Sequence, residues 1–336
     1  MNDALKKVVK YVLSLMVAAV LLYYSFRGVD WHEFIAGLGT CRWGLVLLSM
    51  TAGLAAFVFR ALRWRRLMLP IDPTIDRLTV FDAVNIGNIS NFIIQYLGEL
   101  VRTGIIVGRN RTRKARYDSI LGTVVLERGW DVISLIILFV ILLAFRWGEF
   151  GSFFRDEIWT RFTGRFSSAA WLVLAALVAV IAALVAAVWL LRGRVGFCGK
   201  VCNAFKGIFT GIGSCLRMEH KWLFMLYTAA IWAMYWLMMV FMTGAFPATS
   251  AAGLGLVDAL FLMLVGSIAS FIPVPGGFGA YHFLVSTALM ALYGFSRGDG
   301  MVFATLAHES QAVNMVIWGA VAYLVEMIRS DRRAEE

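Results

Sequence analysis

A group of charged side chains lies in the middle of an otherwise apolar stretch in the first half of this chain. Glu127 and Asp131 are four residues apart, so a helix would place both carboxylates on one face. Two carboxylates that share a face inside a membrane repel each other, unless a cation lies between them or one is protonated. Arg128 and Arg102 are the candidate cations, and Glu99 lies one helical turn before Arg102. This set could bind a charged headgroup or carry a proton.

The depth of these charges favours a functional role. Glu127 lies about nine residues into its apolar segment, which corresponds to roughly 13 Å along a helix axis. Each charge at the centre of a bilayer costs at least about 2.5–3.5 kcal/mol on insertion scales. The alternative is a structural ion pair that fixes the preceding polar segment to this helix, and both roles are compatible. Arg102 could also be simply the first residue of a cytoplasmic loop.

A second polar group lies near the C-terminal end. Prolines and glycines interrupt the chain before His282, and His308 and Glu309 are adjacent within a later apolar segment. Gly276 and Gly277 allow a tight backbone turn, whose free N–H groups could bind an anion. His308 or Glu309 could carry a proton at this depth. For His282 a structural, hydrogen-bonded role is an equal alternative.

These residues belong to elements that are too apolar for a soluble protein. The chain is 60% hydrophobic and 15% charged, whereas soluble domains have about 25% charged residues. Segments of roughly 20 apolar residues are long enough to span a bilayer. Six such segments are expected, at residues 8–26, 43–59, 119–145, 168–191, 222–246 and 301–327. The prediction is an all-α integral membrane protein, with residues 1–336 forming a single polytopic domain.

Two further apolar segments, residues 78–101 and 257–294, are not typical spans. The first contains several Asn, Gln and Glu residues, and the second is broken by Pro and Gly. Most Lys and Arg residues lie in alternate loops, which the positive-inside rule assigns to the cytoplasm together with both termini. Each of the two segments then begins and ends on one side of the membrane. We expect re-entrant hairpins around a polar cavity, and for 257–294 a complete hairpin of two short helices is an alternative that is nearly as well supported.

The order of elements predicts two related halves, residues 8–145 and 168–327. Each half reads span, span, hairpin, span, and the halves enter the membrane from opposite sides. This is an inverted-topology repeat, in which substrate sites lie near the midplane between the halves. Glu99 precedes Glu127 by 28 positions and His282 precedes Glu309 by 27, so these pairs would correspond.

Residues 192–221 are expected to form a cytoplasmic amphipathic helix on the inner leaflet. Cys198, Cys202 and Cys215 belong to its apolar stripe, so we do not assign them with His220 to a zinc site, and we expect no metal. The chain has no nucleotide-binding or protease motif, so we expect no cofactor. The net charge of +10 comes from basic residues between apolar segments. Such residues favour contact with an anionic leaflet and no nucleic-acid partner.

Three motifs carry a resemblance to a known family. They are Gly98-Glu99 with Arg102, Glu127-Arg128 with Asp131, and the run Pro275-Gly276-Gly277 with Gly279. In order and spacing they resemble the lysylphosphatidylglycerol synthase transmembrane-region family, also called flippase-like, over nearly the whole chain. The resemblance implies a helical membrane domain with re-entrant segments. In two-domain members this domain moves aminoacylated phosphatidylglycerol to the outer leaflet, and a separate cytosolic domain attaches the lysine.

This sequence differs from the family pattern at several positions. Only residues 331–336 follow the last expected helix, so we expect no cytosolic transferase domain and no lysyltransferase activity. The family often has Glu where His282 stands here, and often an Arg in the last helix, which here carries His308 and Glu309. Gln95, Tyr96 and Leu97 stand where a Pro and an Arg are common. These differences bear on which lipid headgroup the protein recognises more than on its fold.

The leading hypothesis is a translocase in the inner cell membrane for a phosphate-bearing lipid, of which aminoacylated lipids are one class. Arg102 and Arg128 would attract the phosphate, and the carboxylates would balance charge, meet a cationic group or carry a proton. One alternative is an accessory subunit that docks a lipid-modifying enzyme partner on residues 196–218. Another is an embedded transferase, with Glu127 or Asp131 as base and a donor groove lined by Arg60 and Arg63. No donor motif supports it, and no catalytic residue is assigned.

Overall fold

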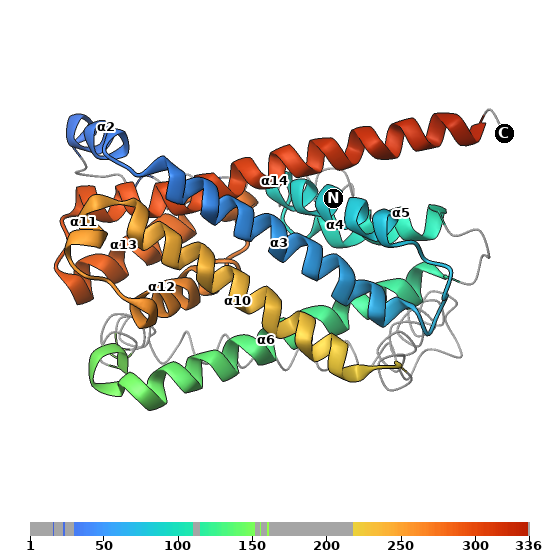
Figure 1. Cartoon of the computed structure of the whole chain (residues 1–336), viewed down its shortest axis with the longest axis horizontal. Helices are drawn as coiled ribbons and strands as arrows, with labels where there is room; N and C mark the ends of the chain where they lie inside the picture. The colour runs from blue at the N-terminus through green and yellow to red at the C-terminus, as the bar shows by residue number, and fades with distance from the viewer. Residues whose placement is uncertain are drawn as a thin grey trace, which may run out of the picture.

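The computed structural model describes residues 30–109, 115–151 and 218–334, and the single residues 16, 23, 155 and 160. Within these residues every regular element is a helix. In the described part of the chain, four helices are long and apolar enough to cross a membrane, and they run lengthwise through the molecule (Figure 1). They are α3 (Trp43–Met68), α6 (Tyr117–Arg146), α10 (Lys221–Ala245) and α14 (Arg297–Ala334). The predicted all-α membrane architecture is confirmed.

The boundaries differ from the predicted ones mainly where helices end in charged residues. α3 was expected to end at residue 59 but continues to Met68, and α14 continues to Ala334. Three predicted elements, the spans 8–26 and 168–191 and nearly all of the amphipathic helix 192–221, lie outside the described residues.

The sequence of α6 shows why such a helix suits a bilayer. Ile133, Ile136, Ile137 and Val140 recur at helical spacing and are 45%, 56%, 52% and 58% exposed. A continuous exposed isoleucine and valine stripe is unfavourable in water but suits contact with acyl chains. The first turns of α6 instead bury polar side chains, including Thr123 and Glu127, against neighbouring helices. The helix therefore has one lipid-type face and one polar internal face.

The predicted segment 78–101 folds as a helical hairpin of α4 (Arg77–Ile93) and α5 (Leu97–Arg109). Both helices are shorter than the roughly 20 residues of a full span. Asp76 caps α4 by accepting hydrogen bonds from the N–H groups of Leu78 and Thr79. Burial alone would raise the pKa of Asp76, but these bonds hold it below its ordinary value.

The predicted segment 257–294 forms a second hairpin of α12 (Leu256–Ala269) and α13 (Ala280–Tyr293). The 3₁₀ turn η4 (Pro275–Gly277) lies between its helices. Gly276, Gly277 and Gly279 have φ angles of 60°, 75° and 78°, which side chains with a Cβ rarely adopt. The glycines therefore allow the sharp return of the chain that the sequence predicted.

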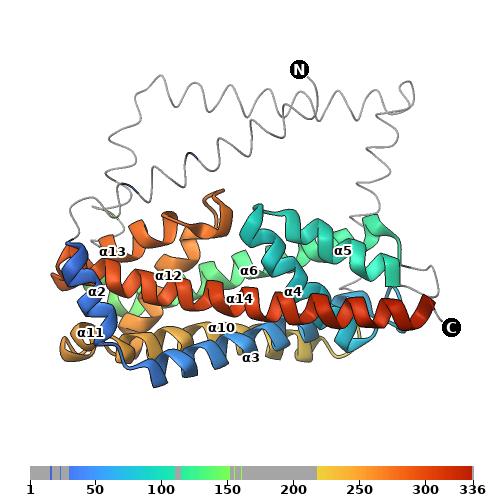
Figure 2. The ribbon, with the colours of Figure 1, turned by 90° about the horizontal axis from the view of Figure 1, so that it is seen from above.

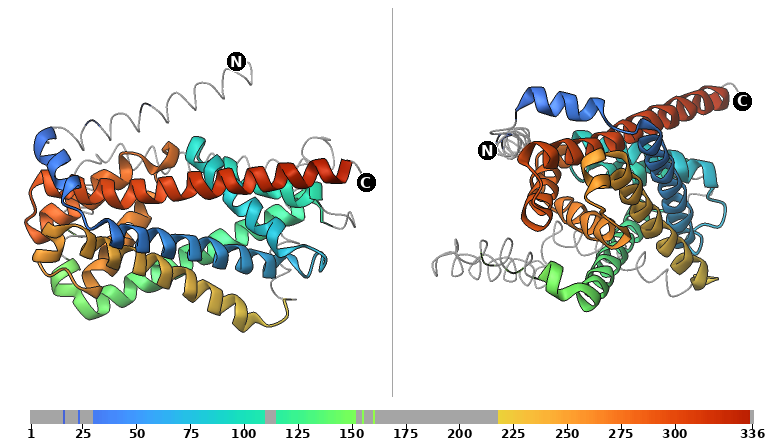
Figure 3. Two further views of the ribbon diagram at one scale, coloured as in Figure 1. Left: turned by 45° about the horizontal axis from the view of Figure 1, so that its top comes forward. Right: turned by 60° about the vertical axis from the view of Figure 1, so that its left-hand side comes forward.

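The two hairpins enter from opposite ends of the molecule and their tips meet near its middle (Figure 2). The Gln95 side chain donates a hydrogen bond to the Ser270 carbonyl at 3.3 Å. The rings of Phe92 and Phe278 meet edge to face, with centroids 5.2 Å apart. α14 lies along both hairpins, in contact with α4 and α13 (Figure 3). The two hairpin tips are therefore in direct contact, and α14 connects the two hairpins.

The helix ends that the charge pattern assigns to the same side of the membrane lie at the same end of the molecule. The C-terminal ends of α3, α5 and α14 lie at one end of the molecule, with the N-terminal ends of α6 and α10 (Figure 1). There Arg109 pairs with Glu326, and Arg329 lies 3.4 Å from Asp82. The short helices α2 (Trp31–Gly39), α11 (Pro247–Ala251) and η1 (Trp147–Gly151) lie at the other end. Each end has its own buried apolar core beside one hairpin.

Candidate functional site

Glu127 is the centre of a buried charge network, and its side chain is fully buried. Arg63 on α3 donates a hydrogen bond through Nη2 to its Oε1 at 3.1 Å. Arg102 on α5 places Nη1 2.8 Å from Oε2. Arg60, one turn before Arg63, lies farther away, with Nε 3.9 Å from Oε1. Three cations from two helices therefore surround one carboxylate on α6.

Arg63 also resolves the repulsion between the two carboxylates of α6. The same Nη2 that bonds Glu127 donates to Asp131 Oδ1 at 2.7 Å. The cation expected between these carboxylates is present, but it is Arg63 and neither Arg102 nor Arg128. Arg128 instead pairs with Glu99 of the hairpin. We name the seven residues Arg60, Arg63, Glu99, Arg102, Glu127, Arg128 and Asp131 the charge network.

Aromatic rings form the walls of the charge network. The Arg102 guanidinium lies over the Trp64 ring, 4.5 Å from its centroid, and Arg63 lies 5.9 Å from the centroid of Phe224. The Trp64 indole N–H donates to Thr123 on α6 at 2.9 Å. Cation–π contacts gain strength where water is excluded. Each of these guanidinium groups therefore contacts an aromatic ring as well as Glu127.

The charge network has more cationic capacity than its carboxylates satisfy. Its four arginines face three carboxylates, which leaves one net positive charge. Among the described residues, four buried guanidinium nitrogens of the charge network have no hydrogen-bond partner, namely Arg60 Nε, Arg63 Nε, Arg63 Nη1 and Arg102 Nη2, against two such carboxylate oxygens, Glu99 Oε2 and Glu127 Oε2. A buried donor without a partner costs about 1–3 kcal/mol. An anion with several oxygens, such as a phosphate, would satisfy such donors and the excess charge.

Sequence reasoning assigned Arg60 and Arg63 only to the groove of the transferase alternative and missed their contacts with Glu127. Both residues lie beyond residue 59, where the apolar segment was expected to end and a loop to begin. The available signal was their spacing of three residues, followed by Trp64, which continues the helix with one face directed inward. The other five members of the charge network were predicted.

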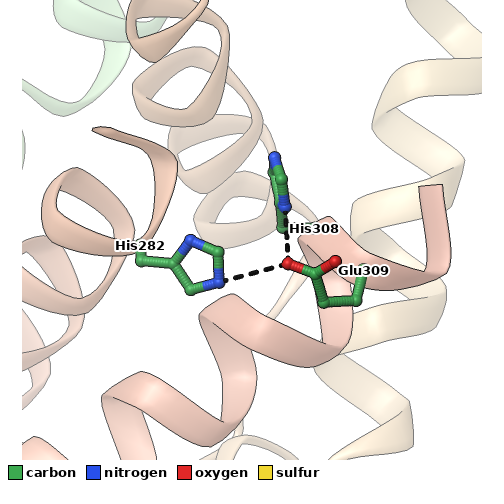
Figure 4. Close-up of side chains that lie close together, drawn as sticks. All are labelled: His282, His308 and Glu309. Carbon is green, nitrogen blue, oxygen red and sulfur yellow. Dashed lines mark hydrogen bonds and ion pairs between the residues drawn. The ribbon is translucent and has the colours of Figure 1, made fainter. Parts of the chain in front are cut away.

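The second predicted group also comes together, as shown in Figure 4. Glu309 Oε1 lies 2.9 Å from His308 Nδ1 and 3.5 Å from His282 Nε2. His308 Nε2 lies 2.9 Å from the Gly276 carbonyl oxygen. We name His282, His308 and Glu309 the His–Glu cluster. It joins α13 and α14 directly beside the glycine turn.

The glycine turn contributes differently from the expectation. The N–H group of Gly277 donates to Val274 within the turn, so it is engaged in the fold. Gly276 presents its carbonyl oxygen to His308. A Cβ at Gly277 would lie 3.4 Å from His308 Nε2. The two glycines thus bring the backbone against the imidazole ring and supply an acceptor to it.

The comparisons with known proteins agree with this architecture. Residues 11–319 match the family described as the lysylphosphatidylglycerol synthase TM region. Neither the curated proteins nor the solved structures contain a match to this chain. The matched range includes the charge network, both hairpins and the His–Glu cluster. The chain therefore belongs to the lysylphosphatidylglycerol synthase TM region family.

Proposed function

We propose that this protein moves a phosphate-bearing lipid between the two leaflets of the inner cell membrane. The observation that carries the proposal is the charge network, a buried site with excess positive charge and unpartnered guanidinium N–H groups. Membrane proteins retain intramembrane charges chiefly where they face an internal route or a binding site. A lipid phosphate would bind the arginines while its acyl chains remain outside the bundle.

The position of the two hairpins suggests a route for the lipid headgroup through the protein. We infer from the positive-inside rule that both termini lie in the cytoplasm, which would put the charge network in the cytoplasmic half and the His–Glu cluster in the outer half. The hairpin tips meet between them through Gln95, Ser270 and two phenylalanine rings. We infer that separation of the tips opens the passage between the two polar groups.

Arg60 offers the sharpest test, because it lies farthest from the carboxylate among the three arginines that surround Glu127. The protein is reconstituted into vesicles that contain fluorescent phosphatidylglycerol, and an impermeant reductant reports the lipid that reaches the outer leaflet. A charge-assisted hydrogen bond contributes about 1.5–3 kcal/mol. Arg60→Gln should therefore slow translocation by roughly 10–100-fold. Arg116→Gln is the matched control, since Arg116 is 74% exposed and pairs only locally with Asp118.

Three outcomes decide between the functions. Slow transfer by Arg60→Gln and normal transfer by Arg116→Gln supports the proposal. Equal translocation rates for Arg60→Gln and wild type, at equal amounts of reconstituted protein, would show that the headgroup does not pass through the charge network. No transfer by the wild type with any phospholipid would favour the accessory-subunit alternative.

A further inference from the structure

His308 has an acceptor at each ring nitrogen. Its Nε2 lies 2.9 Å from the Gly276 carbonyl, and its Nδ1 lies 2.9 Å from Glu309 Oε1. A neutral imidazole carries only one N–H group. The Gly276 carbonyl can only accept, so Nε2 carries the proton. In a neutral imidazole Nδ1 then directs its lone pair at a carboxylate oxygen, and this contact is favourable only if a proton or a metal ion lies between the two atoms.

His282 completes a set of ligand atoms around that position. Its Nε2 lies 3.5 Å from the same Glu309 oxygen, and the three ligand atoms all lie within 4.8 Å of one another. Zn²⁺ binds nitrogen and oxygen at about 2.0–2.2 Å in a tetrahedron, which places neighbouring ligand atoms about 3.3 Å apart. Small side-chain movements would bring the three atoms to these distances.

The surroundings of His308 resemble those of a metal-ligating histidine. Such a residue donates its second ring N–H to a carbonyl or carboxylate, which fixes the ring and the tautomer. Here the acceptor for the second ring N–H is the Gly276 carbonyl oxygen. The rings of Phe278 and Tyr281 pack against the imidazole, each with its centroid 5.2 Å away. His308 is therefore held with Nδ1 directed into the cluster.

We propose that the His–Glu cluster binds a divalent transition-metal ion of the Zn²⁺ type. His282 Nε2, His308 Nδ1 and Glu309 Oε1 are its ligands. Two imidazoles and one carboxylate suit Zn²⁺ and its neighbours better than Ca²⁺ or Mg²⁺, which prefer oxygen ligands. Three protein ligands leave one position open, and the Glu309 side chain is 38% exposed. Water or an anionic oxygen fills this position.

The metal would also link the second hairpin to α14. His282 lies on α13, whereas His308 and Glu309 lie on α14. The ion therefore fixes the hairpin tip whose Phe278 contacts the opposite tip. Metal binding does not depend on lipid transport, so the two proposals can fail separately.

The test uses the full chain in detergent, with all four cysteines replaced by serine so that thiols cannot bind metal. After treatment with a chelator the protein is titrated with Co²⁺, whose visible absorption reports tetrahedral coordination, and Zn²⁺ is counted by mass spectrometry. One ion per chain is expected. His282→Ala and Glu309→Gln should each weaken binding by more than the roughly 10–100-fold that outer-shell changes cause. His32→Ala and His220→Ala alter exposed histidines and are the matched controls.

Thermal unfolding shows whether the variants are folded. Added Zn²⁺ should raise Tm in the parent protein and both controls. It should leave Tm unchanged in the cluster variants, which still unfold cooperatively. Failure of the parent protein to bind Co²⁺ would overturn the proposal and leave a protonated His308 as the cation. Unchanged affinity in His282→Ala and Glu309→Gln would overturn it as well.

Discussion

Arg63 shows how one residue determines whether buried charges are tolerated. Its guanidinium is fully buried and bonds two carboxylates that would otherwise repel each other. Without it, Glu127 would keep Arg102, but Asp131 would lose the partner that the structure gives it. Removal of one partner from a buried ion pair leaves an uncompensated charge. The stability of the charge network therefore depends more on Arg63 than on the exposed Arg128.

Replacement of Arg63 should therefore destabilise the protein strongly. Arg63→Gln is expected to lower the free energy of unfolding by about 3–5 kcal/mol, the usual effect of breaking a buried pair. The measurement is denaturant unfolding in detergent micelles, followed by tryptophan fluorescence. Asp131→Asn in the Arg63→Gln protein should restore part of the loss, since it removes one carboxylate left unpaired.

Arg116→Gln provides the reference for this measurement. Its ion pair with Asp118 is exposed, and such pairs contribute about 0–1 kcal/mol. If Arg63→Gln were no less stable than Arg116→Gln, the charge network would not contribute to stability. Its arginines would then be free to rearrange around a ligand.

At the scale of elements, the first hairpin depends on the contact between its two helices. Gly87 on α4 and Gly98 on α5 face each other so closely that a Cβ at Gly98 would lie 2.0 Å from the Gly87 carbonyl oxygen. The Asn91 side chain accepts a hydrogen bond from the Gly98 N–H at 2.7 Å. This contact positions the start of α5, and with it Glu99 and Arg102.

Gly98→Ala should separate the two helices of this hairpin. Overpacking of this kind costs about 1–3 kcal/mol, and it should also weaken the Arg102 contact with Glu127. Gly104→Ala is the matched control in the same helix, because nothing lies within 4 Å of a Cβ there. Alanine should stabilise that position by about 0.5–1 kcal/mol. The free energy of unfolding of both variants checks the prediction, and a Gly98→Ala protein as stable as Gly104→Ala would contradict it.

The sequence predicted the elements better than their pairing. Uninterrupted apolar segments identified α3, α6, α10 and α14, because hydrocarbon requires long apolar helices. The sequence did not predict the charged C-terminal end of α3, since Arg60 and Arg63 resemble loop residues until their partners are known. Arg63 and Glu127 are 64 positions apart, and no local pattern encodes such a contact. The residues of the His–Glu cluster were predicted as one polar group. His308 and Glu309 are adjacent in sequence, and His282 follows the proline and glycine break of the second hairpin.

At the scale of the whole molecule, the order of the described elements can be compared with the predicted inverted repeat. α3, the first hairpin and α6 follow the same order as α10, the second hairpin and α14. The equivalent helices α3 and α10 pack along each other, and the two hairpins enter from opposite ends. The charge network and the His–Glu cluster then occupy corresponding places in the two halves. The repeat remains a prediction, because the first span of each half lies outside the described residues.

The repeat makes a topological prediction that cysteine labelling can test. In a protein without its native cysteines, single cysteines replace Pro73 and Arg116, which flank the first hairpin, and Gly253 and Arg297, which flank the second. An impermeant maleimide should label Pro73→Cys and Arg116→Cys only from the cytoplasm. It should label Gly253→Cys and Arg297→Cys only from outside, because each hairpin returns to the side on which it begins. All four positions are exposed, so a lack of access would reflect the membrane and not burial.

The pairs matter more than the single positions in this experiment. If Pro73→Cys and Arg116→Cys were labelled from opposite sides, α4 and α5 would together cross the bilayer. Arg102 would then no longer lie in a hairpin that returns to the cytoplasm, and the two halves would not be inverted copies. Opposite labelling of Gly253→Cys and Arg297→Cys would have the same consequence for the His–Glu cluster. Labelling of each pair from one side would place the meeting hairpin tips within the bilayer, where a lipid headgroup must pass.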